Sequence, residues 1–254
     1  MEFVGKVGSD SNGRRLKEEL TKRNISTKYF STDECSQTGL AVVMLEDNGQ
    51  NRIIVFPGAN MHICREDIQR AFEKDYDAVI VQFEVPQQIV TEVCKQAMQR
   101  NITVIVDAGP AQKFPLEEIR GIDILSPNET ETFVMCGIKP DSLEMAREAA
   151  KILKQRCSAN FVVIKMGKNG ALLYSDSKTE LFSVQDVHVV DTTAAGDAFT
   201  AAMTIEYVKS RDIEKAIRFA NIVGTITVTR LGAMPSLPSI AEVEEFIKEN
   251  NIKW

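Results

Sequence analysis

The residues best suited to chemistry lie together in segment 191–199, which reads DTTAAGDAF. The small residues at 194–196 let the backbone approach a ligand closely, and the apolar spacing that starts at Phe199 predicts a helix that begins here. Free N–H groups and the dipole at a helix N-terminus favour an anion such as phosphate. Asp197 falls in the first turn of this helix, where it could act as a general base or only complement the helix dipole.

A second candidate pair is Asn128 and Glu131, which stand three residues apart in the segment SPNETE (126–131). Two side chains at this spacing share one face of a helix. They could serve a ligand near the helix end, or Asn128 could be an N-cap with Glu131 as its capping-box partner.

A third candidate is segment 165–170, KMGKNG, which follows an apolar run. The residue types at Lys165, Gly167 and Gly170 are those of a plain β-turn. Glu84 stands just after another apolar run, and open α/β sheets bind ligands at the carboxyl ends of their strands. A solvated loop carboxylate is the alternative for Glu84.

These candidates are spaced along an alternation of apolar runs and helical patterns. We expect strands at 78–83, 102–106, 122–125, 161–165 and 171–174. We expect helices at 86–99, 115–120, 129–135, 142–155, 196–209, 212–229 and 240–250. This alternation predicts βαβ units and therefore an α/β fold with a mostly parallel sheet.

The first 60 residues follow a different pattern. Segment 5–10, GKVGSD, is expected to form a Gly-rich turn, and helical spacing after Asp10 predicts a helix that reaches about Asn24. Apolar runs at 38–46 and 50–56 are joined by Asp-Asn-Gly at 47–49, which predicts a β-hairpin.

The composition narrows the class of protein. Of 254 residues, 44% are hydrophobic and 26% charged, which is typical of a globular chain and excludes disordered and fibrous classes. The 30 Lys and Arg and 36 Asp and Glu form no long block of one sign, so neither a nucleic acid nor a membrane is expected as a partner. There is no signal peptide pattern at the start, and the five widely spaced cysteines indicate no disulfide framework, so we expect a cytoplasmic protein with a small-molecule ligand.

Taken in order, the motifs resemble those of the ribokinase-like (PfkB) carbohydrate kinases. Segment 191–199 is similar to the family's C-terminal signature, SPNETE to its Asn-x-x-Glu motif, KMGKNG to its nucleotide loop, FAN at 219–221 to its adenine-side helix, and TRLGAMPSLP at 229–238 to the tail typical of its ribokinases. The resemblance implies a ribokinase-like three-layer α/β sandwich with a mostly parallel central sheet. It also implies one domain over residues 1–254, with 38–57 as part of a small β lid.

The resemblance further implies an ATP-dependent kinase that phosphorylates the primary hydroxyl of a sugar, with D-ribose as the expected substrate. In such a kinase Asp197 would be the base, and Ala195 and Gly196 would form the anion hole. The nucleotide would contact Asn128, Glu131, Lys165, Gly167, Gly170, Gly196 and Asn221, with Glu131 also holding Mg²⁺ through water, while the sugar would contact Glu84 and Asp197. A monovalent cation, K⁺, would be bound by Asp191, Thr193, Thr227, Arg230, Gly232 and Ser236.

The chain departs from the family pattern near its start. The family's opening strand with a sugar-binding Asp, the lid strands that follow and a Gly-Gly-Lys-Gly-Ala-Asn segment have no match here. We therefore expect an incomplete sugar side and a hairpin that a second copy covers in a homodimer. A fructokinase, a ketodeoxygluconate kinase, a nucleoside kinase and a nucleotide-binding protein with little turnover stay open. A dehydrogenase and a Walker-type NTPase are disfavoured, because neither fingerprint occurs.

Overall fold

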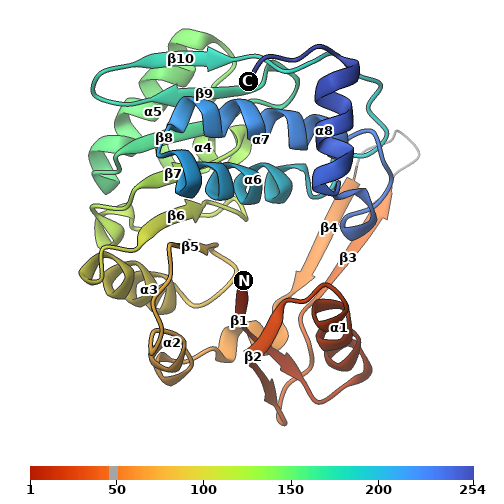
Figure 1. Cartoon of the computed structure of the whole chain (residues 1–254). Coiled ribbons are helices and arrows are strands. Elements are labelled where there is room, and N and C mark those ends of the chain that lie inside the picture. Colours follow the sequence, from red (N-terminus) through yellow and green to blue (C-terminus); the bar gives the residue numbers. More distant parts are fainter. Residues whose placement is uncertain (46–50) are drawn as a thin grey trace. The chain divides into compact units, whose positions relative to one another are not determined.

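The computed structural model describes residues 1–45 and 51–254, and the chain falls into two compact units (Figure 1). The N-terminal unit consists of residues 1–75 and 83–96, and the C-terminal unit consists of residues 76–82 and 97–254. The single kinase domain over 1–254, with 38–57 in a β lid, remains a prediction.

The N-terminal unit opens with a βαβ motif. Strands β1 (Glu2–Gly8) and β2 (Ser26–Asp33) run parallel and are joined by helix α1 (Ser11–Lys22). The Asp10 carboxylate caps α1 by accepting a 2.8 Å hydrogen bond from the Gly13 N–H, which confirms the predicted opening helix.

The predicted Gly-rich turn over 5–10 is wrong for residues 5–8, which lie in β1. Gly5 is required by its neighbours rather than by a turn, because a Cβ there would lie 2.7 Å from the Phe3 ring and 3.0 Å from the Phe30 ring. The two rings meet edge to face over the glycine, with their centroids 5.4 Å apart.

The predicted hairpin is present in the same unit. Strands β3 (Leu40–Leu45) and β4 (Asn51–Phe56) pair antiparallel, and the predicted turn at 47–49 lies outside the described residues. The short helices η1 (Gly58–His62) and α2 (Arg65–Ala71) follow.

A six-stranded sheet forms the centre of the C-terminal unit, in the order β10-β9-β8-β7-β6-β5. Its strands are β5 (Ala78–Val81), β6 (Thr103–Asp107), β7 (Ile124–Ser126), β8 (Phe161–Lys165), β9 (Ala171–Tyr174) and β10 (Thr179–Phe182). Strands β5 to β8 are parallel, and β9 and β10 are antiparallel to their neighbours, so the sheet is mostly parallel, as predicted.

The helices lie close to their predicted positions. They are α3 (Gln87–Gln99), whose first ten residues belong to the N-terminal unit, η2 (Leu116–Ile119), α4 (Glu129–Cys136), α5 (Leu143–Cys157), η3 (Gly167–Asn169), α6 (Ala195–Ser210), α7 (Ile213–Thr227), η4 (Met234–Ser236) and α8 (Ile240–Glu249). In the ranges that the structure describes, no helix is both long and apolar enough to cross a membrane.

Helices cover both faces of this sheet, which gives the predicted three-layer sandwich (Figure 1). Ile105 of β6 and Val163 of β8 are buried in one core with side chains of α6 and α7. Successive residues of a strand point to opposite faces, so Val162 and Ile164 are buried on the other face, where α5 packs against β8 and β9.

Polar groups lie at both ends of the contact between β6 and α6. Thr103, Ile105 and Asp107 share the face that α6 covers. Arg211, at the C-terminal end of α6, donates a 2.7 Å hydrogen bond to Thr103, while Thr200, near the N-terminal end, donates one of 2.7 Å to Asp107. The N-terminus of α6 therefore lies at the carboxyl end of the parallel strands.

Candidate active site

An ion pair between two strand ends forms the floor of the candidate site. Lys165 ends β8 and Asp107 ends β6, and the Lys165 Nζ lies 2.6 Å from the Asp107 Oδ1. Ser126, at the end of the intervening strand β7, has a small and fully buried side chain. The Lys165 side chain therefore has room to reach across this strand to Asp107.

The ion pair is largely withdrawn from solvent. The side chains of Lys165 and Asp107 are 12% and 6% exposed. The second oxygen of Asp107 accepts a hydrogen bond from the Thr200 hydroxyl on α6, so both carboxylate oxygens have partners. A buried charged pair of this kind is tolerated only when its hydrogen bonds are satisfied.

Asp197 lies in the first turn of α6, as predicted from its position. The preceding residue Ala194 has a left-handed backbone (φ 62°) and gives α6 no side-chain cap among the described residues. The Ala195 N–H donates a 3.2 Å hydrogen bond to the Thr192 carbonyl. An uncapped helix N-terminus of this kind offers N–H groups and a positive dipole to an anion.

The carboxylate of Asp197 sits among other polar groups of the C-terminal unit. Gln82, the residue after β5, donates a 3.3 Å hydrogen bond to its Oδ1. Although the residue is exposed, protein atoms displace part of the water around its carboxylate. This desolvation and the negative charge of Asp107 raise the pKa of Asp197, while the Lys165 ammonium and the Gln82 hydrogen bond oppose the rise.

Gly196 is the point where the start of α6 approaches Lys165. A Cβ added at Gly196 would lie 3.6 Å from the Lys165 Nζ and 4.0 Å from its Cε. The structure therefore brings together three of the predicted residues, Lys165, Gly196 and Asp197, around one helix N-terminus. A positive side chain, helix N–H groups and a carboxylate base in one place are suited to phosphoryl transfer.

Asn128 and Glu131 form a complete capping box at the start of α4. The Asn128 side chain accepts from the Glu131 N–H at 2.9 Å, and the Glu131 Oε2 accepts from the Asn128 N–H at 2.7 Å. The Asn128 amide also donates to the Glu131 Oε1 at 2.8 Å. The capping interpretation is confirmed, and a role toward a ligand stays a prediction.

Glu131 is buried and belongs to the same group of charges. Burial raises the pKa of Glu131, the Lys165 ammonium and the Asn128 N–H lower it, and Asp107 and Asp197 raise it further. Over the residues that the structure places, no three His, Cys, Asp or Glu side chains are arranged to hold one metal ion. The single carboxylate of Glu131 still fits Mg²⁺, which prefers few protein ligands and several waters.

The KMGKNG segment forms a tight connection from β8 to β9 through η3. The Met166 N–H donates to the Gly170 carbonyl at 2.7 Å, and the Gly170 N–H donates to the Gly167 carbonyl at 3.0 Å. Gly170 has φ 93°, and a Cβ there would lie 1.9 Å from the Phe182 carbonyl oxygen. The β-turn interpretation is thus confirmed, and contact of Gly167 and Gly170 with a nucleotide stays a prediction.

Asn221 is buried on α7 and holds the end of β10. Its amide donates to the Phe182 carbonyl at 2.8 Å and to the Ser183 carbonyl at 3.4 Å. Its predicted contact with adenine stays a prediction.

The residues predicted for a monovalent cation are only partly joined by contacts. Asp191 accepts from the Thr193 N–H (2.9 Å) and hydroxyl (2.6 Å) through one oxygen and from the Gly232 N–H (2.9 Å) through the other. These hydrogen bonds, those from Thr193 foremost, lower the pKa of Asp191. The carboxylate therefore ties the segment before α6 to the segment after α7.

The other three predicted cation ligands direct their side chains to different partners. The Thr227 hydroxyl donates to the Val223 carbonyl, Arg230 pairs with Glu242 at 2.7 Å, and the Ser236 hydroxyl donates to the Ala233 carbonyl. The Arg230 guanidinium cannot bind a cation, and backbone carbonyls are the ligands that the sequence prediction assumed for most of the set. Glu84 belongs to the N-terminal unit, so its predicted sugar contact remains a prediction.

Sequence reasoning did not single out three residues of this site. They are Asp107, Thr200 and Gln82. Asp107 forms the ion pair with Lys165, Thr200 donates to Asp107, and Gln82 donates to Asp197. Asp107 carried a usable signal, because it is a charged residue at the end of the apolar run TVIVD, where ligands of parallel sheets bind. Thr200 and Gln82 carried none, since a polar residue in a helix or after a strand is common.

Comparisons with known proteins agree with this chemistry. The family model for the pfkB family carbohydrate kinases matches residues 1–240. The ribokinase of Bacillus subtilis is 33% identical over 247 residues, which cover 96% of this chain and 80% of that protein. The chain therefore belongs to the pfkB family of carbohydrate kinases.

Solved structures show the same fold. The structure of Arabidopsis thaliana ribokinase complexed with ribose and ATP matches with a TM-score of 0.88 at 32% identity, covering 97% of this chain and 81% of that one. Ribokinase from Thermotoga maritima matches with a TM-score of 0.86 at 33% identity and the same coverage. The ribokinase-like fold expected from the motifs is thus confirmed.

Proposed function

We propose that this chain is an ATP-dependent ribokinase, which transfers the γ-phosphoryl group of ATP to the primary hydroxyl of D-ribose and yields ribose 5-phosphate. The observation that carries the proposal is Asp197 at the uncapped N-terminus of α6, beside Lys165 and Gly196. The similarity to ribokinases at about one-third identity supports ribose as the sugar.

In the proposed reaction Asp197 is the general base. Its carboxylate takes the proton of the sugar hydroxyl as that oxygen attacks the γ-phosphorus. The raised pKa of Asp197 suits this task, because a carboxylate of ordinary acidity holds a proton weakly. The N–H groups at Gly196 and Asp197 form the anion hole that stabilises the transferring group, and the Ala195 N–H joins them when it leaves the Thr192 carbonyl.

Glu131 is proposed to organise Mg²⁺ through water. Bound Mg²⁺ would neutralise negative charge on the phosphates. The capping box supports this assignment, since the three hydrogen bonds between Asn128 and Glu131 fix the carboxylate next to Asp197 and Lys165. In the same proposal Asn128, Lys165, Gly167, Gly170 and Asn221 face the nucleotide, and Glu84 contacts the sugar.

K⁺ is proposed to bind beside Asp191, with Thr193, Thr227, Arg230, Gly232 and Ser236 as further ligands, chiefly through backbone carbonyls. The lowered pKa of Asp191 keeps its carboxylate ionised, which suits an oxygen ligand for a hard cation. An ion here would stiffen the segment that leads into the anion hole, because Asp191 lies three residues before the α6 N-cap.

The test is the release of ADP from purified protein with Mg·ATP and a panel of sugars. We expect release that depends on ribose, is faster in K⁺ than in tetramethylammonium, and falls by about 10²–10⁴-fold in Asp197→Asn. A strong preference for fructose, ketodeoxygluconate or a nucleoside would replace ribose as the substrate. Unchanged activity in Asp197→Asn would reject the mechanism, and thermal protection by ATP without sugar-dependent release would indicate nucleotide binding alone.

A further inference from the structure

We propose that Lys165 is a catalytic residue whose ammonium contacts the transferring phosphoryl group, and that Asp107 is the positioning residue that aims it there. The proposal rests on the function proposed above, and it assigns to Lys165 more than a place in the nucleotide loop.

The Lys165 ammonium lies between Asp107 and the start of α6. The Lys165 Nζ lies 2.6 Å from Asp107 on one side and 3.6 Å from where a Cβ of Gly196 would stand on the other. The absent side chain at Gly196 leaves the ammonium facing the backbone at the N-terminus of α6. An anion held by the helix N–H groups would therefore meet a positive charge as well as the helix dipole.

The ion pair also holds the ammonium of Lys165 in place. A lysine has a long side chain with several rotatable bonds, and fixing it during the reaction costs conformational entropy. Asp107 is 4% exposed as a residue, and its second oxygen is bound by Thr200, so it cannot turn away from Lys165. The pair is thus set before any substrate arrives, which is the preorganisation that electrostatic catalysis requires.

The Lys165 ammonium has more hydrogen-bond donors than the ion pair with Asp107 uses. An ammonium has three N–H groups, and the ion pair with Asp107 uses one. Lys165 can therefore keep its contact with Asp107 and also donate to phosphoryl oxygens. Because Asp107 balances its charge, the ammonium is held at the site between turnovers.

Lys165 takes no part in the proton transfer of the proposed chemical step. The bond from the sugar oxygen to the γ-phosphorus forms while the bond from that phosphorus to the β,γ-bridging oxygen breaks. The leaving ADP keeps the electron pair, and the hydroxyl proton goes to Asp197. The Lys165 ammonium stabilises the negative charge on the transferring group.

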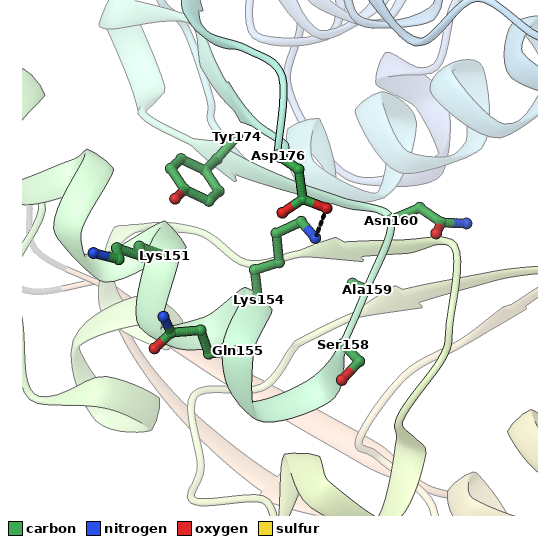
Figure 2. Close-up of a pocket in the computed structure, with 8 residues that line it drawn as sticks. All are labelled: Lys151, Lys154, Gln155, Ser158, Ala159, Asn160, Tyr174 and Asp176. Atoms are coloured by element: carbon green, nitrogen blue, oxygen red, sulfur yellow. Dashed lines mark hydrogen bonds and ion pairs between the residues drawn. The ribbon is translucent and has the colours of Figure 1, made fainter.

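A second lysine of the same unit provides a control for removal of a largely covered ammonium. Lys154 on α5 pairs with Asp176 at 2.9 Å, and its side chain is 13% exposed, against 12% for Lys165, whereas Asp176 is 91% exposed, against 6% for Asp107. Figure 2 shows this pair in a surface pocket, which Tyr174 and Asn160 also line. None of the residues assigned to the active site lines that pocket. Lys154→Met therefore tests what the loss of a covered lysine does to the fold, and the double variant below tests the loss of a buried pair.

The experiment is a double-mutant cycle on the full chain, with Lys165→Met, Asp107→Asn, both together, and Lys154→Met. We expect kcat for ribose phosphorylation to fall about 10²-fold in Lys165→Met, with the KM for ATP changed much less. Asp107→Asn should lower kcat by about tenfold or more through misplacement of the ammonium. The double variant should match Lys165→Met, because a positioning residue has no effect once the residue it positions is absent.

The double variant also guards against a loss caused by misfolding. Each single change leaves one buried charge without its partner, whereas the double variant leaves neither. Its thermal midpoint should therefore be equal to or above that of the single variants. Lys154→Met should retain the kcat of the unchanged protein.

The pH profile of kcat provides a readout that a structural role would not give. The charged groups around Asp197 are Asp107 at the end of β6, Lys165 at the end of β8 and Glu131 on α4. Lys165 lowers the pKa of Asp197 and Asp107 raises it. The acidic limb should therefore move to higher pH in Lys165→Met and to lower pH in Asp107→Asn.

Several results would overturn the proposal. These are a kcat in Lys165→Met within threefold of the unchanged protein, losses in the double variant that equal the product of the single losses, or acidic limbs that move in the same direction. Failure of the proposed function is separate, because the unchanged protein would then release no ADP with ribose. If it does release ADP while Lys165→Met retains full kcat, only the assignment of Lys165 and Asp107 is rejected.

Discussion

At the scale of single residues, Asp197 shows a conflict between stability and activity. Lost water and the charge of Asp107 raise its pKa, so the fold favours the protonated carboxyl. The ionised form that a base needs prevails above this pKa, and there the fold is less stable than it would be with a neutral side chain. The cost grows as the pH rises through the pKa of Asp197 in the folded protein.

We therefore predict that Asp197→Asn gains or retains stability while it loses activity. At pH 7 its thermal midpoint should equal or exceed that of the unchanged protein, and kcat should fall by about 10²–10⁴-fold. In the unchanged protein, kcat/KM should fall as the pH drops through the pKa of Asp197, above the ordinary range of an aspartate. Thermal melts and a pH–rate series check both parts, and a lower midpoint for Asp197→Asn at pH 7 would contradict the explanation.

At the scale of elements, two glycines in the C-terminal unit have different reasons to be glycine. Gly170 connects η3 to β9 with φ 93° and lies against the Phe182 carbonyl. Gly196 is in the first turn of α6, where a Cβ would make only ordinary contact with Lys165. The first is required by the backbone, and the second by the space in front of Lys165.

Alanine at each position should separate these reasons. Gly170→Ala should lower the free energy of unfolding by more than about 1 kcal/mol, because an L-residue is strained at this φ and its Cβ would clash. Gly196→Ala should leave that free energy unchanged or raise it by up to about 1 kcal/mol, yet lower kcat by about 10²-fold. Urea denaturation and ADP release measure the two effects, and a stable, inactive Gly170→Ala would reverse the assignment.

The elements also explain which parts could be predicted from sequence. The strands from β5 to β9 and all the longer helices of the C-terminal unit were predicted within a few residues, because buried parallel strands are continuous apolar runs. Strand β1 was not, because its two glycines resemble a turn until Phe3 and Phe30 are seen to pack over Gly5. Helix α2 and strand β10 were not predicted either, because both are short and neither has a strong periodic pattern.

The site was predictable only where its chemistry is local. The apolar spacing after Asp197 placed it in a helix first turn, while its role as base came only from the family resemblance, and the Asn128–Glu131 box follows from a spacing of three. The ion pair of Lys165 with Asp107 joins residues 58 positions apart on strands that are not adjacent. Such a contact depends on strand order and register, which no local pattern reports.

At the scale of the whole molecule, the hairpin of the N-terminal unit presents apolar side chains to solvent. Leu40, Val42, Ile54 and Phe56 are exposed, and the register sets Leu40 opposite Phe56 and Val42 opposite Ile54. Two such cross-strand pairs form a continuous apolar surface on a two-stranded sheet, which has little stability alone. A second copy of the chain that covers this surface in a homodimer stays our prediction.

Ile54→Lys tests the predicted homodimer. Ile54 is 46% exposed, and a charge in the middle of the surface should convert a dimer to a monomer in sedimentation experiments. Leu143→Lys is the control, since Leu143 is 53% exposed at the start of α5 and outside the hairpin. A monomeric unchanged protein, or a dimer that tolerates Ile54→Lys as well as Leu143→Lys, would contradict the prediction.

Side chains along β8 alternate between the two faces of the sheet, and this restricts insertions and deletions within the strand. Phe161, Val163 and Lys165 share the face toward α6, while Val162 and Ile164 share the face toward α5. Deleting or inserting one residue within the strand would turn the lysine toward α5 and bring apolar side chains out of their core. Length changes here are compatible with activity only in steps of two residues, so the count of residues along a buried strand sets the chemistry at its end.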